Sequence, residues 1–406
     1  MRDYSNQAEN RGEGRNIEIT GIETCVVEGN FDWNIVKIQT DTGVTGIGES
    51  YRGGSVVDIM HYMEKFLVGE NPLDVERLFR RMVQETSGHS GTTGKVVTAA
   101  TGIEIALWDI AGKLLDVPVY QLLGGKYRDR VRLYCDCHAG EAYEVDHGYT
   151  DFGGEEIYAP DAYAETAREV LDLGFTALKF DLDTPIDNEP DPFNGRLSNA
   201  AIQHKVETVE AIRDEIGYEV DLAFDCHWDY SFDSGKRLAR KLEPYDLMWL
   251  EDVLPPENMD AQRELSRAVN VPLATGENRF RVHELSQLVE EYAVDILTPD
   301  PSTCGGLAET KAIANRAEEN YMIISPHNVC GPIGTMACVH LGASIPNFDV
   351  LEYHALEVDW WDDLAMNSDP LIEDGHIEVP ETPGLGVELN EEVAKEHAKG
   401  EGTMFA

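Results

Sequence analysis

From residue 131 onward, short apolar runs alternate with amphipathic stretches, and this alternation constrains the fold more than any other feature of the chain. A run of four or five apolar residues fits a buried strand, and the stretches between runs, such as AYAETAREVLDLG and AETKAIANRAEEN, fit helices. Eight such rounds predict a parallel (β/α) barrel. The runs lie at 131–135, 177–180, 220–224, 247–250, 271–275, 294–298, 322–325 and 348–351.

Polar residues follow the last six runs at nearly constant intervals of 23 to 27 residues. In a barrel of this kind the carboxyl ends of the strands form one rim, where the chemistry takes place. An acidic residue after a single strand could instead cap the next helix. The recurrence of a polar group at six successive strand ends favours an active-site rim. The residues are Asp225 with His227, then Glu251, Glu277, Asp300, His327 and Glu352.

Three of these residues, Asp225, Glu251 and Glu277, offer only carboxylate oxygens as ligands. Converging carboxylates repel one another unless a cation neutralises them. Hard oxygen ligands favour Mg²⁺, or Mn²⁺, over Zn²⁺. His227 shares a strand face with Asp225, whereas Cys226 points the other way and is expected to pack in the core. An imidazole beside such a site suits acid or base chemistry better than metal binding.

His327 and Asp300 follow neighbouring runs, so we expect them to lie close together. A carboxylate that accepts a hydrogen bond from one imidazole nitrogen makes the other nitrogen a better base. The structural alternative is a hydrogen-bonded core histidine. Lys179, with Asp181, occupies the end of the second run. An ammonium at that place would bind a substrate oxyanion or pair with a neighbouring carboxylate.

The first part of the chain has a different pattern. Residues 1–15 are polar and indicate a flexible tail, and IEITGIETCVVEG, NIVKIQT and VTGIGE alternate in a way that predicts a small antiparallel sheet. Strands followed by helices predict an α+β domain. The first two rounds of the barrel are long and indicate loop insertions near 140–160 and 182–198. The predicted helices of the α+β domain lie at 54–67, 73–85 and 95–116.

The composition narrows the class of protein. With 32 Lys and Arg against 76 Asp and Glu, the net charge is −44, which would repel nucleic acid and anionic membranes. Acidic residues spread over a globular chain favour a protein adapted to high salt, which screens their repulsion. Seven irregularly spaced cysteines predict buried free thiols rather than disulfides or a zinc site. No signal segment or apolar span is present, so we expect a soluble, cytoplasmic protein.

Several motifs together resemble the enolase superfamily, and within it the mandelate racemase-like group of sugar-acid dehydratases. The resemblance covers about residues 17 to 390. It rests on TGIGES, GIEIALWDIAGKLLDVPVYQLLGGKYRDRV, ALKFD, FDCHW, WLED, TGEN, PDPSTCGGLAE, SPHN and LEYH. It implies a capping domain at 16–127, a (β/α)7β barrel at 128–356 and a C-terminal segment at 357–406 that packs back on the capping domain.

The resemblance also implies roles for single residues. Asp225, Glu251 and Glu277 would bind one Mg²⁺, Asp300 and His327 would form the base dyad, and Glu352 would contact the substrate carboxylate. Loops near GNFDW (29–33) and SYRGGS (50–55) would close over the sugar chain. The substrate-binding residues expected from these loops and from the strand ends are Trp33, Tyr51, Arg52, Asp181 and Asn278.

The implied reaction is the dehydration of an aldonic acid to its 2-keto-3-deoxy acid. His327 would remove the C2 proton, Lys179 would help to hold the negative charge, and His227 would protonate the leaving C3 hydroxyl. Gluconate or galactonate is the favoured substrate, and a pentonate such as xylonate or arabinonate is the alternative. The chain is expected to act on a small-molecule sugar acid as a homo-oligomer.

Two departures from the family pattern bear on the reaction. Many relatives have a second lysine in the second strand, where this chain has Asp181 after Lys179-Phe180, and their proline after Glu-Asp is Val253 here. A two-base racemase or epimerase would need Asp181 as its second base. A cycloisomerase would usually have the lysine pair, a zinc hydrolase would need an early His-x-His, and a non-catalytic binding protein should lack some of the rim residues.

Overall fold

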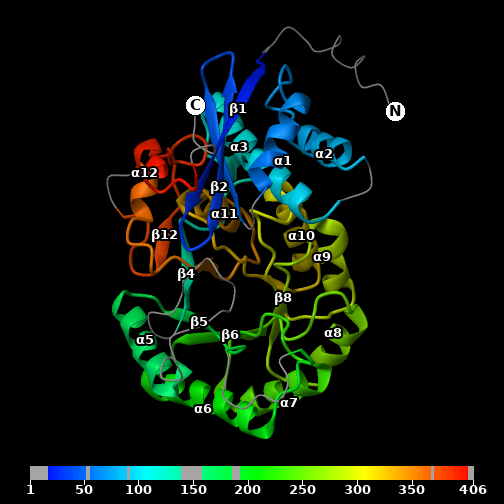
Figure 1. Cartoon of the computed structure of the whole chain (residues 1–406), viewed down its shortest axis with the longest axis vertical. Helices are drawn as coiled ribbons and strands as arrows, with labels where there is room; N and C mark the ends of the chain where they lie inside the picture. The colour runs from blue at the N-terminus through cyan, green and yellow to red at the C-terminus, as the bar shows by residue number, and fades with distance from the viewer. Residues whose placement is uncertain are drawn as a thin grey trace.

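The computed structural model describes residues 17–51, 55–88, 92–138, 158–184, 193–366 and 370–400 (Figure 1). The predicted tail at 1–15 and Arg52 lie outside the described residues. So do most of the first predicted loop insertion and residues 185–192 of the second.

The N-terminal region is an antiparallel sheet covered by helices, at the top of Figure 1. Helix α3 packs closely on β3, because a Cβ atom at Gly46 would lie 2.3 Å from the carbonyl oxygen of Ala106, and one at Gly48 would lie 2.1 Å from that of Gly102. Strands followed by helices are the predicted order. The elements are β1 (Ile19–Glu28), β2 (Asp32–Thr40), β3 (Thr45–Tyr51), α1 (Val56–Met63), α2 (Val75–Thr86) and α3 (Lys95–Leu115).

Eight parallel strands follow, paired in the order β10-β9-β8-β7-β6-β5-β4-β11. An isolated parallel bridge between Ile324 and Phe348 joins the two ends of this order and closes the ring. The strands are β4 (Arg130–Cys137), β5 (Ala177–Asp181), β6 (Asp221–Asp225), β7 (Trp249–Glu251), β8 (Leu273–Thr275), β9 (Ile296–Leu297), β10 (Ile323–Ile324) and β11 (Leu351–Tyr353).

One helix lies between each pair of consecutive strands, so the fold is the predicted (β/α)7β barrel with an N-terminal α+β cap. The last predicted strand, 348–351, begins three residues later than expected, because Phe348 forms only the closing bridge. The helices are α5 (Pro160–Asp172), α6 (Asn199–Ile216), α7 (Phe232–Leu242), α8 (Met259–Ser266), α9 (Arg281–Glu290), α10 (Gly306–Glu319) and α11 (Pro332–Ser344). A short helix, α4 (Val119–Leu122), precedes the barrel.

The barrel interior is apolar below the rim and polar at the rim. Inward-facing apolar residues from the strands form one packed layer, and Lys179 Nζ lies 5.4 Å from the ring centroid of Tyr134 in that layer. Such filling is typical of small parallel barrels. The buried charged groups of the rim, such as Lys179, Asp225 and Glu251, lie beyond this layer, at the carboxyl end of the barrel. The layer consists of Tyr134, Ala177, Ala223, Trp249, Ala274, Ile296 and Val350.

The C-terminal segment contacts both the barrel and the N-terminal sheet. Strand β12 (His376–Glu378) pairs antiparallel with β4, and α12 (Glu391–Glu396) packs near β1, where Ala398 forms a bridge with Val27. Glu391 also accepts a hydrogen bond from Lys37 at 2.6 Å. The domain boundaries given above stay predictions.

Two buried glutamates of the N-terminal region cap helices of the barrel. Glu104 of α3 accepts hydrogen bonds from the amides of Leu307 (3.0 Å) and Ala308 (3.1 Å) in the first turn of α10. Glu49 of β3 does the same at the start of α11, with the amide of Gly331 at 2.6 Å. The first amides of a helix have no partner within it, so these carboxylates satisfy them and match the helix dipole.

All seven cysteines are buried and free, as the sequence predicts. Within the described ranges, no helix is long and apolar enough to cross a membrane.

Candidate active site

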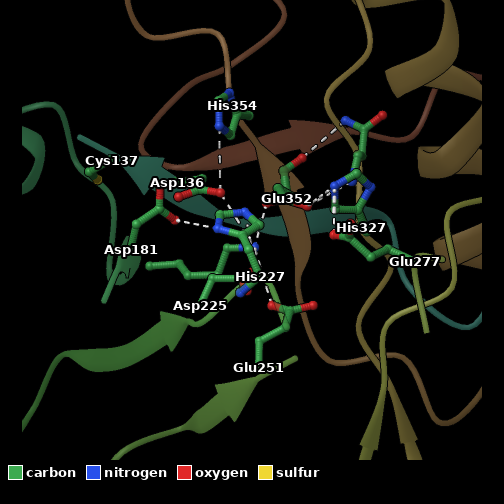
Figure 2. Close-up of polar contacts among 12 residues, drawn as sticks. Asp136, Cys137, Asp181, Asp225, His227, Glu251, Glu277, His327, Glu352 and His354 are labelled. Atoms are coloured by element: carbon green, nitrogen blue, oxygen red, sulfur yellow. Dashed lines mark hydrogen bonds and ion pairs between the residues drawn. The ribbon is translucent and has the colours of Figure 1, made fainter. Parts of the chain in front are cut away.

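The ends of β6, β7 and β8 bring three carboxylates together (Figure 2). Asp225 is the last residue of β6, Glu251 is the last residue of β7, and Glu277 lies two residues beyond β8. One oxygen of each side chain lies within 4.8 Å of the others, and all three side chains are buried. The regular spacing along the sequence has this result because each βα round moves the chain one strand around the rim.

The backbone at these strand ends is unusual. His227 and Trp228 have φ values of 39° and 62°, in the left-handed region that non-glycine residues rarely adopt. Gly276 precedes Glu277 with φ 159°, and a Cβ atom there would lie 2.9 Å from the amide nitrogen of Pro299. Strained conformations of this kind cluster at functional sites, where the surrounding structure holds them.

The carboxylate cluster has the properties of a site for a hard divalent cation. Its donors are all oxygens, which Mg²⁺ prefers. Oε1 of Glu251 is buried and has no hydrogen-bond partner in the described part of the chain. Burial, together with the neighbouring Asp225 carboxylate, raises the pKa of Glu251 to about 7. A cation would satisfy the oxygen and offset the repulsion, so the residues present fit such an ion.

Lys179 lies at the centre of the rim and is fully buried. Its ammonium is 2.8 Å from Glu352 Oε1, 3.2 Å from Glu251 Oε2, 3.3 Å from Asp136 Oδ2 and 3.4 Å from Asp225 Oδ2. Burial alone would lower the pKa of this lysine, but the surrounding carboxylates raise it well above its usual value. Lys179 is therefore a permanent positive charge between the carboxylate cluster and Glu352.

His327 and Asp300, after β10 and β9, form a close pair. Nδ1 of His327 lies 2.8 Å from Asp300 Oδ2, and its Nε2 lies 3.1 Å from Glu277 Oε2 and 3.8 Å from Glu352 Oε2. Burial alone would lower the pKa of His327, but Glu277, Glu352 and Asp300 raise it to about 10. If Nδ1–H donates to Asp300, Nε2 is the nitrogen that faces the carboxylate cluster.

His227 lies on the other side of the ring, four strands from His327. Its backbone amide donates to Asp225 Oδ1 at 2.9 Å, and its Nδ1 lies 3.2 Å from Asp183 Oδ2 and 3.9 Å from Asp181 Oδ1. Burial alone would lower the pKa of His227, but these three carboxylates raise it well above its usual range. These carboxylates therefore favour the protonated imidazole, whose Nε2 lies 3.9 Å from Asp225 Oδ2 of the carboxylate cluster. Cys226 between them is packed in the core.

The residues expected to bind substrate, from the cap and from the strand ends, differ in position. The Tyr51 ring lies 5.8 Å from the His327 ring, so it is close to the rim. Trp33 is fully buried, and its Nε1 donates to the carbonyl of Val329 at 3.0 Å, which places it in the packed joint between cap and barrel. Asn278 donates to Glu277 Oε1 at 2.7 Å. Arg52 is outside the described residues.

Sequence reasoning missed a second group of polar residues at the rim, on β4 and β11. Asp136, His138 and His354 offer ligand or hydrogen-bonding atoms that lie within 4.8 Å of one another. A signal for them was present, since Asp136-Cys137-His138 repeats the Asp-x-His spacing of Asp225 and His227.

Comparison with known proteins places the two parts of the fold. Residues 25–124 match the mandelate racemase/muconate lactonizing enzyme N-terminal domain, and residues 162–393 match the enolase C-terminal domain-like family. These ranges cover the capping region and most of the barrel.

Individual relatives match over nearly the whole chain. A D-xylonate dehydratase of Haloferax volcanii is 48% identical over 97% of this chain and 92% of its own length. A D-galactonate dehydratase of Ralstonia pickettii is 29% identical over 90% of this chain and 91% of its own. A mandelate racemase/muconate lactonizing enzyme-like protein from Rubrobacter xylanophilus has a TM-score of 0.90 at 42% identity, covering 96% of this chain and 99% of that one. The chain belongs to the enolase superfamily, in its mandelate racemase/muconate lactonizing enzyme family.

Proposed function

We propose that the chain is a Mg²⁺-dependent sugar-acid dehydratase whose substrate is a pentonate, with D-xylonate first among the candidates. The observation that carries the proposal is the presence on one rim of a carboxylate cluster, a His–Asp pair and, on the opposite side, a histidine beside two further carboxylates. The relative named a D-xylonate dehydratase supports a pentonate, and the more distant galactonate dehydratases support only the reaction class. The sequence alone favoured gluconate or galactonate, with a pentonate as the alternative. The proposal adopts the pentonate.

The first step in the proposal is removal of the C2 proton. Mg²⁺ held by Asp225, Glu251 and Glu277 would supply positive charge that stabilises the enediolate and offsets the carboxylates around His327. Nε2 of His327 takes the C2 proton, while Asp300 fixes the tautomer through Nδ1. The Lys179 ammonium, already buried at the centre of the rim, holds negative charge that develops on the substrate carboxylate.

The second step is departure of the C3 hydroxyl. His227 faces the rim from β6, opposite His327 on β10, so a substrate between them presents C2 to one imidazole and C3 to the other. His227 donates its proton as the C3–O bond breaks, and water leaves. The resulting enol takes up a proton at C3 and loses the proton of its C2 hydroxyl, which gives the 2-keto-3-deoxy acid. Proton removed and proton donated balance, so no further co-reactant is needed.

Epimerisation is the second candidate on the same scaffold. It would need a second base near C2, and Asp181 would have to serve. The 3.9 Å separation of Asp181 from His227 Nδ1 favours an acidic role for that side of the rim. Solvent deuterium that enters C2 without loss of water would support the epimerase instead.

The test is a panel of pentonic, hexonic and aldaric acids with purified protein, Mg²⁺ and high salt, assayed for 2-keto-3-deoxy products. D-Xylonate should give the highest kcat/KM. Chelation of the metal should abolish turnover, and Mg²⁺ should restore it. If every acid on the panel is inert while the protein binds Mg²⁺, the proposal is wrong.

A variant test assigns the base and the acid. His327→Asn should lower both dehydration and C2 proton exchange by about 10²- to 10⁴-fold. His227→Asn should lower dehydration by a similar factor but retain C2 exchange. A surface variant, His283→Asn on α9, should behave as wild type. Dehydration at the wild-type rate by His327→Asn would remove that residue from the mechanism.

A further inference from the structure

A chain of polar contacts runs from the cap to the rim on the side that neither the carboxylate cluster nor the His–Asp pair uses. It joins Asn30, in the turn between β1 and β2, to His354 after β11, His138 after β4 and Asp181 at the end of β5. These strands are neighbours in the ring, in the order β5-β4-β11. Asn30, Asp181 and His354 are buried, and the His138 side chain is 8% exposed.

The direction of the hydrogen bonds follows from one contact. Nδ2 of Asn30 lies against the carbonyl oxygen of His354, which can only accept, so the amide NH₂ faces this residue. The same Nδ2 lies 2.9 Å from Nδ1 of His354, which must therefore accept as well. A neutral imidazole with an acceptor at Nδ1 carries its hydrogen on Nε2. Burial, and then the neighbouring His138, lower the pKa of His354 to about 3, in keeping with a neutral ring.

The next two contacts continue in the same sense. Nε2 of His354 lies 3.1 Å from Nε2 of His138, and only one proton can occupy that contact, so His138 accepts there and carries its own hydrogen on Nδ1. Nδ1 of His138 lies 3.5 Å from Oδ2 of Asp181. Four residues thus form a directed path whose last member is a carboxylate with one oxygen engaged.

The other oxygen of Asp181 points to a ligand. Oδ1 is buried and has no hydrogen-bond partner among the described residues, although a buried acceptor without a donor is costly. It lies 3.9 Å from Nδ1 of His227, the proposed donor to the C3 hydroxyl. The carbon that follows C3 in the sugar chain would lie beside His227. A hydroxyl on that carbon would supply the donor that Oδ1 lacks.

We propose that Asp181 Oδ1 accepts a hydrogen bond from the C4 hydroxyl of the sugar acid, and that Asn30, His354 and His138 are positioning residues that set the orientation of this carboxylate. The inference rests on the proposed function, since it assumes a polyhydroxy acid bound at the rim. Under this proposal Asn30, a residue of the cap, influences which configuration at C4 is preferred, although Asn30 does not contact C4.

A second metal is the other use of such a cluster, because Asp136, His138 and His354 offer two imidazoles and a carboxylate. Two contacts oppose it. The Lys179 ammonium lies 3.3 Å from Asp136 Oδ2, where a cation would be repelled. Nδ1 of His354 is already engaged by Asn30, and its Nε2 by His138.

The experiment compares kcat/KM for D-xylonate and L-arabinonate, which differ in configuration at C4, in wild-type protein and three variants. Asn30→Asp keeps the shape but cannot donate to His354, His138→Asn breaks the path, and Asp181→Asn changes the carboxylate itself. Each should reduce the preference between the two epimers by about tenfold, the effect of one hydrogen bond, mainly through KM. Asn320→Asp is the control, since Asn320 Nδ2 also donates to a carbonyl, at the far end of α10.

Four outcomes test the inference. The double variant Asn30→Asp with Asp181→Asn should lose no more selectivity than either single variant, because residues of one path are not additive. Unchanged epimer preference in folded Asn30→Asp and Asp181→Asn proteins, judged by thermal unfolding, overturns the inference while leaving the dehydratase intact. Stoichiometric Zn²⁺ binding that His138→Asn abolishes also overturns it. Wild-type protein inactive on all sugar acids would instead refute the proposed function.

Discussion

Lys179 shows how single residues define this site. One ammonium lies within 3.4 Å of four buried carboxylates, from β4, β6, β7 and β11. The desolvation cost of these charges is balanced by their mutual attraction only while every partner is present. The lysine is therefore both a candidate binding group for the substrate carboxylate and a structural counter-ion for the rim.

The first prediction concerns the loss of that charge. Lys179→Met keeps the length of the side chain but leaves buried carboxylates uncompensated, so the metal-free protein should lose about 3–5 kcal/mol of unfolding free energy. Mg²⁺ should restore part of the loss, since it also neutralises Asp225 and Glu251. Chemical unfolding with and without Mg²⁺ measures both effects.

Lys205→Met provides the control. Lys205 is also buried, and its ammonium donates to the carbonyls of Leu182 and Thr184, away from the carboxylate cluster of Asp225, Glu251 and Glu277. Its loss should destabilise the protein without a matching Mg²⁺ rescue. If Mg²⁺ restored the same unfolding free energy to both variants, its effect would not depend on neutralising the carboxylates around Lys179.

The sequence predicted some rim residues and missed others for a physical reason. Asp225, Glu251 and Glu277 follow successive strands, so their convergence can be read from a constant interval along the chain. His138 and His354 directly follow β4 and β11, the first and last strands of the barrel, which become neighbours only when the ring closes. His138 and His354 are therefore not separated by the length of one βα round, so the regular spacing could not predict that they lie together.

At the level of elements, the joint between cap and barrel depends on helix ends. The carboxylates of Glu104 and Glu49 bind amides at the starts of α10 and α11, and both are buried. The helix positions could be predicted from periodicity, but these contacts could not. They join residues more than two hundred positions apart and have no pattern of their own.

The second prediction is a pH dependence of stability. Burial raises the pKa of Glu104 to about 7 from an ordinary value of 4.5. Between these values the folded state binds more protons than the unfolded state, so the contribution is complete below about pH 4.5 and is lost as the pH rises through about 7. Glu104→Gln cannot titrate and should flatten the fall in unfolding free energy across this range.

Chemical unfolding at a series of pH values measures this pH dependence of the unfolding free energy. Glu169→Gln on the exposed face of α5 serves as the matched control and should leave the wild-type slope unchanged. A slope in Glu104→Gln as steep as in wild type would mean that another group is responsible.

At the level of the whole molecule, the net charge of −44 is the dominant property. Like charges spread over one folded chain repel one another, and salt screens this repulsion over a Debye length of about 10 Å at 0.1 M and about 3 Å at 1 M. The high-salt interpretation agrees with the 48% identity to a protein of Haloferax volcanii.

The third prediction follows from this charge. The thermal unfolding temperature should rise with KCl concentration up to molar levels, and the protein should lose structure when salt is removed. Sucrose should give a smaller increase, because it favours compact states without screening charge. A calorimetric series in each additive tests this, and an unfolding temperature independent of KCl would contradict the high-salt interpretation.

The capping of α10 and α11 by Glu104 and Glu49 has a consequence for exchanging parts between relatives. Helix α10 begins six residues after Asp300, and α11 begins five residues after His327. A chimera that takes its specificity loops from a foreign cap would also replace the two acids that hold these helices. Unless the donor cap has carboxylates at both places, the graft would leave amides exposed in the joint and loosen the segments that carry the His–Asp pair. Cap and barrel are thus better exchanged as one module.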